Sequence, residues 1–205
     1  MIKAIFFDMG GVLLPLHLDK CIAAYREFAG FTDIDKYLDP CHQHGLYLEL
    51  ESGAIDLDTF FSRCLEHCRP GTTKETIIRC HSAFFGTPDP DDVKLVKELG
   101  SRYDVCMLSN NNALSMLDHI PNFERAGLPL YSSFKHLFLS HEMHLLKPAP
   151  EIYLRAIKES GHNADEILFI DDSPKNVEGG LNVGIKAVLY DRNATTLRQL
   201  VQSNL

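Results

Sequence analysis

The chain contains 205 residues, of which 45% are hydrophobic, and its 28 acidic and 20 basic residues leave a formal charge of −8. This composition supports a packed core and excludes a disordered chain, which would combine fewer apolar residues with a higher charge density. The acidic balance also argues against a general nucleic-acid binder, although a small anionic ligand needs only a local positive site.

Neither a signal peptide nor a membrane span is predicted. The apolar segment 2–7 is short and interrupted by Asp8, and no stretch approaches the roughly 18 apolar residues of a membrane helix. We therefore expect a cytoplasmic protein without membrane association and with reduced cysteines. Cys64 and Cys68 would share a helix face near His67, but zinc sites usually show tighter paired spacing, so we interpret the cysteines as buried packing residues.

The first half of the chain is predicted to be almost entirely helical. Residues 2–7 form a short apolar run that is typical of a buried strand followed by a tight turn. From about 18 to 86 the apolar residues follow helical spacing, and nothing in this region resembles a strand. Thr72 and Glu75 suit a capping box at the start of one of these helices.

After residue 88, apolar strands alternate with amphipathic helices. Strands are expected at 105–108, 136–139, 167–170 and 186–189. Helices are expected at 89–100, 112–119 and 150–160, then in a segment ending near 184, and finally at 195–201. This alternation predicts an α/β fold, a Rossmann-like parallel sheet sandwiched by helices. Residues 1–15 and 89–205 would form this core, and residues 16–88 would form an inserted all-helical cap.

Polar residues suited to ligand binding follow three of the predicted strands: Asp8, Ser109, Asn110, Asp171 and Asp172. Because ligands of open parallel sheets bind beyond the carboxyl ends of the strands, we expect these residues on one rim, with Lys147 from a neighbouring loop. Paired carboxylates suit Mg²⁺, and a single lysine among them suits a phosphate. Each residue alone has a structural interpretation as a turn, cap or surface residue, but their shared position favours a binding site.

With these residues in place, the sequence resembles the haloacid dehalogenase superfamily. The resemblance is carried by four segments: Ile5–Val12, Met107–Asn110, Lys147-Pro148 and Phe169–Asp172. The helical insert has the position of that family's cap. Segments 108–112 and 146–153 further resemble the branch that contains bacterial α-D-glucose-1-phosphate phosphatase.

The resemblance implies a Mg²⁺-dependent phosphatase for a small phosphorylated metabolite. Asp8 would attack phosphorus and form an aspartyl-phosphate, which splits one difficult step into two. The implied metal ligands are Asp8, the carbonyl of Gly10, Asp172 and, directly or through water, Asp171. The implied phosphate-binding groups are the Ser109 hydroxyl, the Asn110 main-chain amide and Lys147.

Gly10 departs from the usual pattern of these phosphatases, which carry a second Asp two residues after the nucleophile. That Asp protonates the leaving oxygen and then activates water, and such a group is typically worth about 10²–10⁴ in rate. We therefore hypothesise a substrate with a good leaving group, such as a sugar 1-phosphate. His17, His42 and His44 are alternative proton donors, although histidines in a helical lobe are more often packed or surface residues.

Two other functions stay open. A metal-independent dehalogenase, in which Asp8 attacks carbon, is compatible with Gly10 but would leave Asp171 and Asp172 as uncompensated acids. A phosphate-binding protein without turnover is also compatible with Gly10. The sequence does not define the substrate or the oligomeric state. Three aromatic residues are candidates for a pocket wall, but core packing is the safer interpretation: Tyr47, Phe84 and Phe85.

Overall fold

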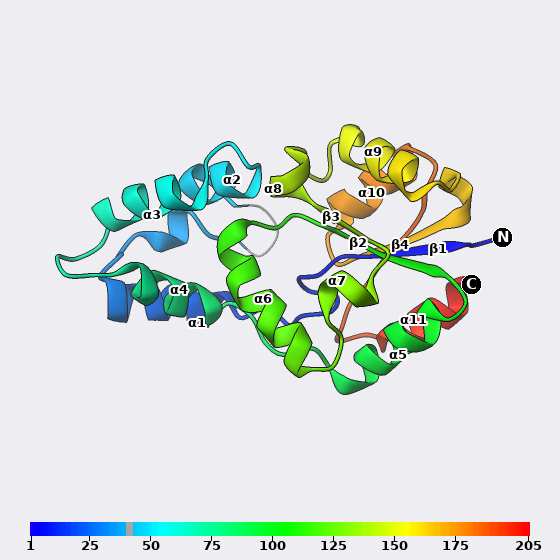
Figure 1. Cartoon of the computed structure of the whole chain (residues 1–205), viewed down its shortest axis with the longest axis horizontal. Helices are drawn as coiled ribbons and strands as arrows, with labels where there is room; N and C mark the ends of the chain where they lie inside the picture. Colours follow the sequence, from blue (N-terminus) through cyan, green and yellow to red (C-terminus); the bar gives the residue numbers. More distant parts are fainter. Residues whose placement is uncertain (40–42) are drawn as a thin grey trace.

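A computed structural model describes residues 1–39 and 43–205. At its centre is a parallel five-stranded sheet with the strand order β3-β2-β1-β4-β5 (Figure 1). The strands are β1 (Ala4–Phe7), β2 (Asp104–Ser109), β3 (His136–Leu139), β4 (Ile167–Asp171) and β5 (Lys186–Leu189). Each lies where the hydrophobic pattern predicted it, so the predicted α/β fold with a parallel sheet is confirmed.

Helices cover both faces of the sheet. Alternate residues of β1 enter different cores: Ile5 and Phe7 pack on one face, and Ala4 and Phe6 on the other. The first face is covered by α5 (Pro90–Gly100), α6 (Ala113–Arg125), α7 (Leu130–Ser133) and α11 (Leu197–Asn204). The second is covered by α8 (Ser140–Met143), α9 (Pro150–Ser160) and α10 (Pro174–Asn182) (Figure 1). The central strand β1 is therefore buried on both sides, as its uninterrupted apolar run requires.

The segment between β1 and α5 forms a separate helical layer at one end of the molecule (Figure 1). Its α-helices are α1 (Leu18–Ala24), α2 (Gly45–Glu51), α3 (Leu57–Glu66) and α4 (Lys74–Ser82). Short helical turns at Tyr25–Ala29 and Ile34–Lys36 complete it. These helices enclose their own apolar cluster, to which α6 of the core contributes Leu114. The helical insertion is confirmed, while its limits at residues 16 and 88 stay a prediction.

Two local features differ from the sequence-based expectations. The capping box at Thr72 is wrong, because the hydroxyl of the next residue, Thr73, caps α4 by accepting a hydrogen bond from Thr76 N at 3.3 Å. Helix α6 continues through Pro121, beyond its predicted end. A proline removes one helical hydrogen bond, but the turn that follows it places Phe123 fully inside the core, which offsets that loss.

Two further sequence-based expectations concern the burial of the cysteines and the absence of a membrane-spanning helix. Cys21, Cys64, Cys80 and Cys106 are buried free thiols, in agreement with their interpretation as packing residues. Cys41 lies outside the described residues. In the described ranges, none of the helices has the length and apolar composition needed to cross a bilayer.

Candidate active site

Asp8 directly follows β1, and its carboxylate is held by a main-chain hydrogen bond and an ion pair. Its Oδ1 accepts a hydrogen bond from Met9 N at 2.7 Å and lies 3.0 Å from Lys147 Nζ. The chain then turns through Gly11, whose φ is +71°, and a Cβ on this residue would collide with the Asp172 carboxylate. Glycine suits this position because it adopts a positive φ without strain and leaves room for the Asp172 carboxylate.

Lys147 joins the ends of three strands. Its Nζ donates hydrogen bonds to Asp171 Oδ2 at 2.6 Å and to Leu108 O at 2.9 Å, and it forms an ion pair with Asp8 Oδ1 at 3.0 Å. Burial by itself lowers the pKa of Lys147, but Asp171 and Asp8 outweigh it and hold that pKa above its usual value. In this arrangement the lysine primarily neutralises two buried acids.

Asp171 is fully buried and both of its oxygens are engaged. Oδ2 contacts Lys147, while Oδ1 accepts hydrogen bonds from Ser173 N at 2.8 Å and from Asn176 Nδ2 at 3.0 Å. The sequence indicated only that Asn176 faces the polar end of its helix. The structure shows that its side chain also anchors Asp171, and that its main-chain carbonyl accepts a hydrogen bond from the Tyr153 hydroxyl at 2.8 Å.

Three carboxylates gather at this rim. Asp8, Asp171 and Asp172 each place an oxygen within 4.8 Å of the others, the one such group of potential metal ligands found in the described part of the chain. Burial raises the pKa of Asp8 to about 7; Lys147 opposes this effect, and the two neighbouring acids add to it. Burial and Asp171 raise the pKa of Asp172 to about 6. A hard divalent cation would relieve this repulsion, so the donor set fits Mg²⁺.

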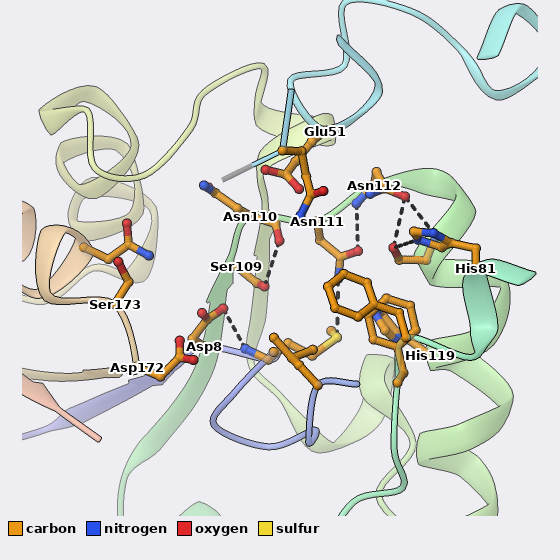
Figure 2. Close-up of a pocket in the computed structure, with 18 residues that line it drawn as sticks. Asp8, Glu51, His81, Ser109, Asn110, Asn111, Asn112, His119, Asp172 and Ser173 are labelled. Carbon is orange, nitrogen blue, oxygen red and sulfur yellow. Dashed lines mark hydrogen bonds between the residues drawn. The ribbon is translucent and has the colours of Figure 1, made fainter. Parts of the chain in front are cut away.

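A cavity lies over Asp8, between the sheet edge and the helical insert (Figure 2). The core contributes Asp8, Gly10, Asp172, Ser173 and the consecutive residues Ser109, Asn110, Asn111 and Asn112. The insert contributes Gln43, Glu51, His81, Phe84 and Phe85. Phe84 and Phe85 pack in the insert's apolar cluster, as interpreted from the sequence, and both also form cavity wall, the alternative that the sequence left open. Tyr47 is fully buried in the insert's apolar cluster, as expected.

Ser109 and Asn110 both line the cavity at the end of β2, where a bound phosphate was expected. The Asn110 side chain also has a task that the sequence did not reveal. Its Nδ2 donates to Lys147 O at 3.0 Å, and its Oδ1 accepts a hydrogen bond from Lys147 N at 2.8 Å. Asn110 thereby fixes the loop that carries the lysine.

Two buried histidines line the cavity beside Phe85, although no sequence motif pointed to them: His81 and His119 (Figure 2). The Ser115 hydroxyl donates to Asn112 Oδ1 at 3.1 Å, so it accepts the 2.9 Å hydrogen bond from His81 Nε2, which places the imidazole proton on Nε2. Burial lowers the pKa of both histidines to about 3. Both are therefore neutral near pH 7.

The histidines proposed from the sequence as proton donors are placed differently. Among the described residues that line the cavity, His17 and His44 do not appear. His42 lies outside the described residues. The insert instead directs Glu51, the last residue of α2, toward the cavity (Figure 2). No sequence pattern pointed to Glu51, since a glutamate at a helix end is normally solvated.

This fold and this rim of strand-end carboxylates define a hydrolase family. Residues 2–184 match the haloacid dehalogenase-like hydrolase family, and the chain belongs to it. A curated relative, the D-ribitol-5-phosphate phosphatase of Bacteroides thetaiotaomicron, is 33% identical over 201 residues, which cover 98% of this chain and 97% of the relative. This relative is named for D-ribitol 5-phosphate and not for glucose 1-phosphate, so it does not support the finer resemblance to the glucose-1-phosphate phosphatase branch.

Solved structures show the same architecture. A HAD family enzyme from Bacteroides thetaiotaomicron, in complex with magnesium and inorganic phosphate, has a TM-score of 0.89 and 26% identity, covering 98% of this chain and 99% of its own. A predicted HAD-like hydrolase from Porphyromonas gingivalis has a TM-score of 0.89 and 29% identity, covering 100% and 98%. The L-2-haloacid dehalogenase of Xanthobacter autotrophicus, with 22% identity, a TM-score of 0.63 and coverage of 98% and 82%, shares the fold.

Proposed function

We propose that this protein is a Mg²⁺-dependent phosphatase that hydrolyses a small phosphorylated polyol or sugar through an aspartyl-phosphate. One observation carries the proposal: Asp8 lies at the floor of an open cavity, 3.0 Å from Lys147 Nζ and grouped with Asp171 and Asp172. A dehalogenase has no need of these paired acids, and they repel one another unless a cation is bound.

The contacts suggest a role for each residue. The Met9 amide and Lys147 hold Asp8 Oδ1, so that Oδ2 is left to attack phosphorus. The Ser109 hydroxyl and the Asn110 main-chain amide bind phosphoryl oxygens. Lys147 balances the charge between Asp8 and the phosphate.

The metal ligands are Asp8, Asp172 and the carbonyl of Gly10. Asp171 takes part through water, because both of its oxygens already have protein partners. When bound, Mg²⁺ neutralises charge on the phosphoryl oxygens. The magnesium and phosphate in the related structure support this assignment.

The substrate class follows from the cavity and from the relatives. The cavity wall supplied by the insert combines aromatic rings with amide, imidazole and carboxyl groups, which suits a small hydroxylated molecule. The curated relative is named for D-ribitol 5-phosphate, an ester of a primary alcohol. This name favours a polyol or sugar phosphate, and it weakens the hypothesis that the absence of an acid at Gly10 restricts the enzyme to sugar 1-phosphates.

A screen of phosphorylated metabolites tests the function. D-ribitol 5-phosphate, glucose 1-phosphate, glucose 6-phosphate and p-nitrophenyl phosphate are each incubated with the purified protein and Mg²⁺, with and without EDTA. We expect Mg²⁺-dependent phosphate release that Asp8→Asn lowers by at least about 10⁴-fold, as expected for loss of a nucleophile. Absence of any hydrolysis would support a binding protein without turnover. In a parallel incubation with 2-chloropropionate, EDTA-resistant release of chloride would support a dehalogenase.

A further inference from the structure

The turn after Asp8 has no group that can protonate a leaving oxygen. Gly10 offers only its main chain, yet there is room at this position for a larger residue. A Cβ on Gly10 would meet Leu16 Cδ2 at 3.4 Å, an ordinary contact. Because the cavity wall opposite Asp8 belongs to the helical insert, a proton donor for the leaving group has to be sought there.

Glu51 is placed to act on that side of the cavity. It is the last residue of α2 and is only 6% exposed, and it shares the cavity lining with Asp8 and Ser109 (Figure 2). Within the described ranges, no hydrogen bond or ion pair reaches its carboxyl group, whereas Glu49 on the same helix is paired with Arg63 at the surface. A buried carboxyl group without a protein partner is free to bind a ligand.

The main chain of Glu51 is tied to the core. The Ser140 hydroxyl donates to Glu51 O at 2.7 Å and accepts a hydrogen bond from Asn111 N at 2.9 Å. Ser140 begins α8 at the end of β3, and Asn111 follows β2. This bridge fixes the end of α2 over the sheet edge, so the position of Glu51 does not depend on packing within the insert alone.

The surroundings of Glu51 favour its acid form. Burial raises its pKa to about 8; Lys147 opposes this effect and Asp8 adds to it. At neutral pH the group therefore carries a proton. His81, which the insert also places on the cavity, is not in its acid form at neutral pH, because burial lowers its pKa to about 3.

On the basis of the proposed phosphatase function, we propose that Glu51 is the general acid and base that stands in for the missing carboxyl group at Gly10. In the first step Asp8 forms a bond to phosphorus, the bond from phosphorus to the leaving oxygen breaks, and that oxygen takes the Glu51 proton. In the second step water attacks phosphorus, its proton goes to the Glu51 carboxylate, and Asp8 leaves as a carboxylate. The products are an alcohol and inorganic phosphate, and both residues return to their starting forms.

The test compares two leaving groups, because p-nitrophenolate departs without a proton and an alkoxide does not. For Glu51→Gln we expect kcat/KM on D-ribitol 5-phosphate, or on the alkyl phosphate that the screen identifies, to fall by about 10²–10⁴. On p-nitrophenyl phosphate we expect the fall in kcat/KM to stay below tenfold. Because the second step also loses its base, p-nitrophenol appears in a burst before slow turnover. Glu49→Gln, on the same helix, is the matched control and leaves both rates unchanged.

Rescue gives a second measurement. Gly10→Asp introduced into the Glu51→Gln variant restores alkyl phosphate turnover if a proton donor is all that is missing. Equal losses on both substrates, or no loss on either, would overturn the role of Glu51 while leaving the phosphatase function intact. If Glu51→Gln does not fold, the wild-type protein decides: a shallow dependence of kcat/KM on leaving-group acidity supports a donor, and a steep one excludes it. Failure of the wild-type protein to hydrolyse either ester would instead refute the proposed function.

Discussion

The two walls of the cavity are built in different ways. On the core side, Asp8, Ser109 and Asp172 lie at the ends of parallel strands, and the hydrogen bonds between the strands fix where each strand ends. On the insert side, Glu51 and His81 come from separate helices, which are positioned by side-chain packing and by single hydrogen bonds to the core at Ser140 and Ser115. The core wall holds charged groups in fixed contacts, whereas the insert wall presents neutral imidazole and carboxyl groups to the ligand.

This difference separates two kinds of task. The chemistry on phosphorus is the same for every ester, so its residues belong to the rigid sheet edge. The part of the substrate that varies lies toward the helical insert, whose residues change without disturbing the sheet. We therefore expect substitutions on the core side to affect metal binding and stability together, and substitutions on the insert side to affect mainly the leaving group and the pH response.

The largest effect is expected for Lys147→Met. This change leaves Asp8 and Asp171 buried without their common cation, and loss of one partner from a buried ion pair typically costs about 3–5 kcal/mol. Urea unfolding in the presence of EDTA measures it. Because Mg²⁺ supplies positive charge at the same carboxylates, adding it restores part of the loss.

The matched control is Lys135→Met, which removes a lysine paired with Asp104 at the surface. Exposed pairs contribute less than about 1 kcal/mol, so this variant unfolds close to the wild type. If both variants lose the same stability, the strand-end rim depends no more on its charges than the surface does.

A pair of glycine variants compares the two regions at similar backbone geometry. Gly11 and Gly71 both have positive φ, +71° and +87°, but a Cβ on Gly11 would collide with the Asp172 carboxylate, whereas one on Gly71 has nothing within 4 Å. Each Gly→Ala change adds backbone strain of about 1–2 kcal/mol. Only Gly11→Ala also displaces a proposed metal ligand, so we expect its kcat/KM to fall by about 10²-fold.

Gly71→Ala retains the wild-type kcat/KM with Mg²⁺ and unfolds only slightly earlier in urea. Activity measured against Mg²⁺ concentration gives a second comparison. In Gly11→Ala, displacement of Asp172 raises the Mg²⁺ concentration needed for half-maximal activity. Wild-type Mg²⁺ dependence in Gly11→Ala would show that Asp172 adjusts without loss, and would remove it from the proposed ligands.

The difference between the two walls also explains how much the sequence revealed. The sequence was sufficient to predict that Asp8, Asp171 and Lys147 lie together. A parallel sheet brings the carboxyl ends of its strands to one edge, whatever surrounds the sheet. The apolar runs themselves gave both ends of β3 and β5 correctly. Interactions that depend on a side-chain rotamer, such as the hold of Asn176 on Asp171, have no counterpart in a sequence pattern.

The insert wall was far less predictable. Its helices were foreseen from apolar spacing, but which side chains face the cavity depends on how the insert packs on the core. Phe84 and Tyr47 look alike in sequence, yet one lines the cavity and the other lies inside the insert. Glu51 was overlooked for the same reason, because its burial follows from contact between α2 and α8, which are far apart in the chain.

The smallest expected effect concerns acid stability at the boundary between the two regions. His119 of the core is buried against Phe85 of the insert, and its pKa is lowered to about 3. Below its ordinary pKa of about 6.5 the unfolded chain takes up a proton that the folded chain refuses until pH nears 3, so the contribution of His119 to stability is present above pH 6.5 and is lost as the pH falls. At pH 5 this loss amounts to about 2 kcal/mol. His119→Gln lacks this titration, so its unfolding free energy decreases less from pH 7 to pH 5 than that of the wild type, by about the same 2 kcal/mol. The buried carboxyl groups contribute with the opposite sign, but they are present in both proteins and cancel in the comparison. Urea unfolding of the two proteins at both pH values measures the difference, and parallel pH profiles would show that His119 binds a proton within the folded protein and that this boundary is open to water.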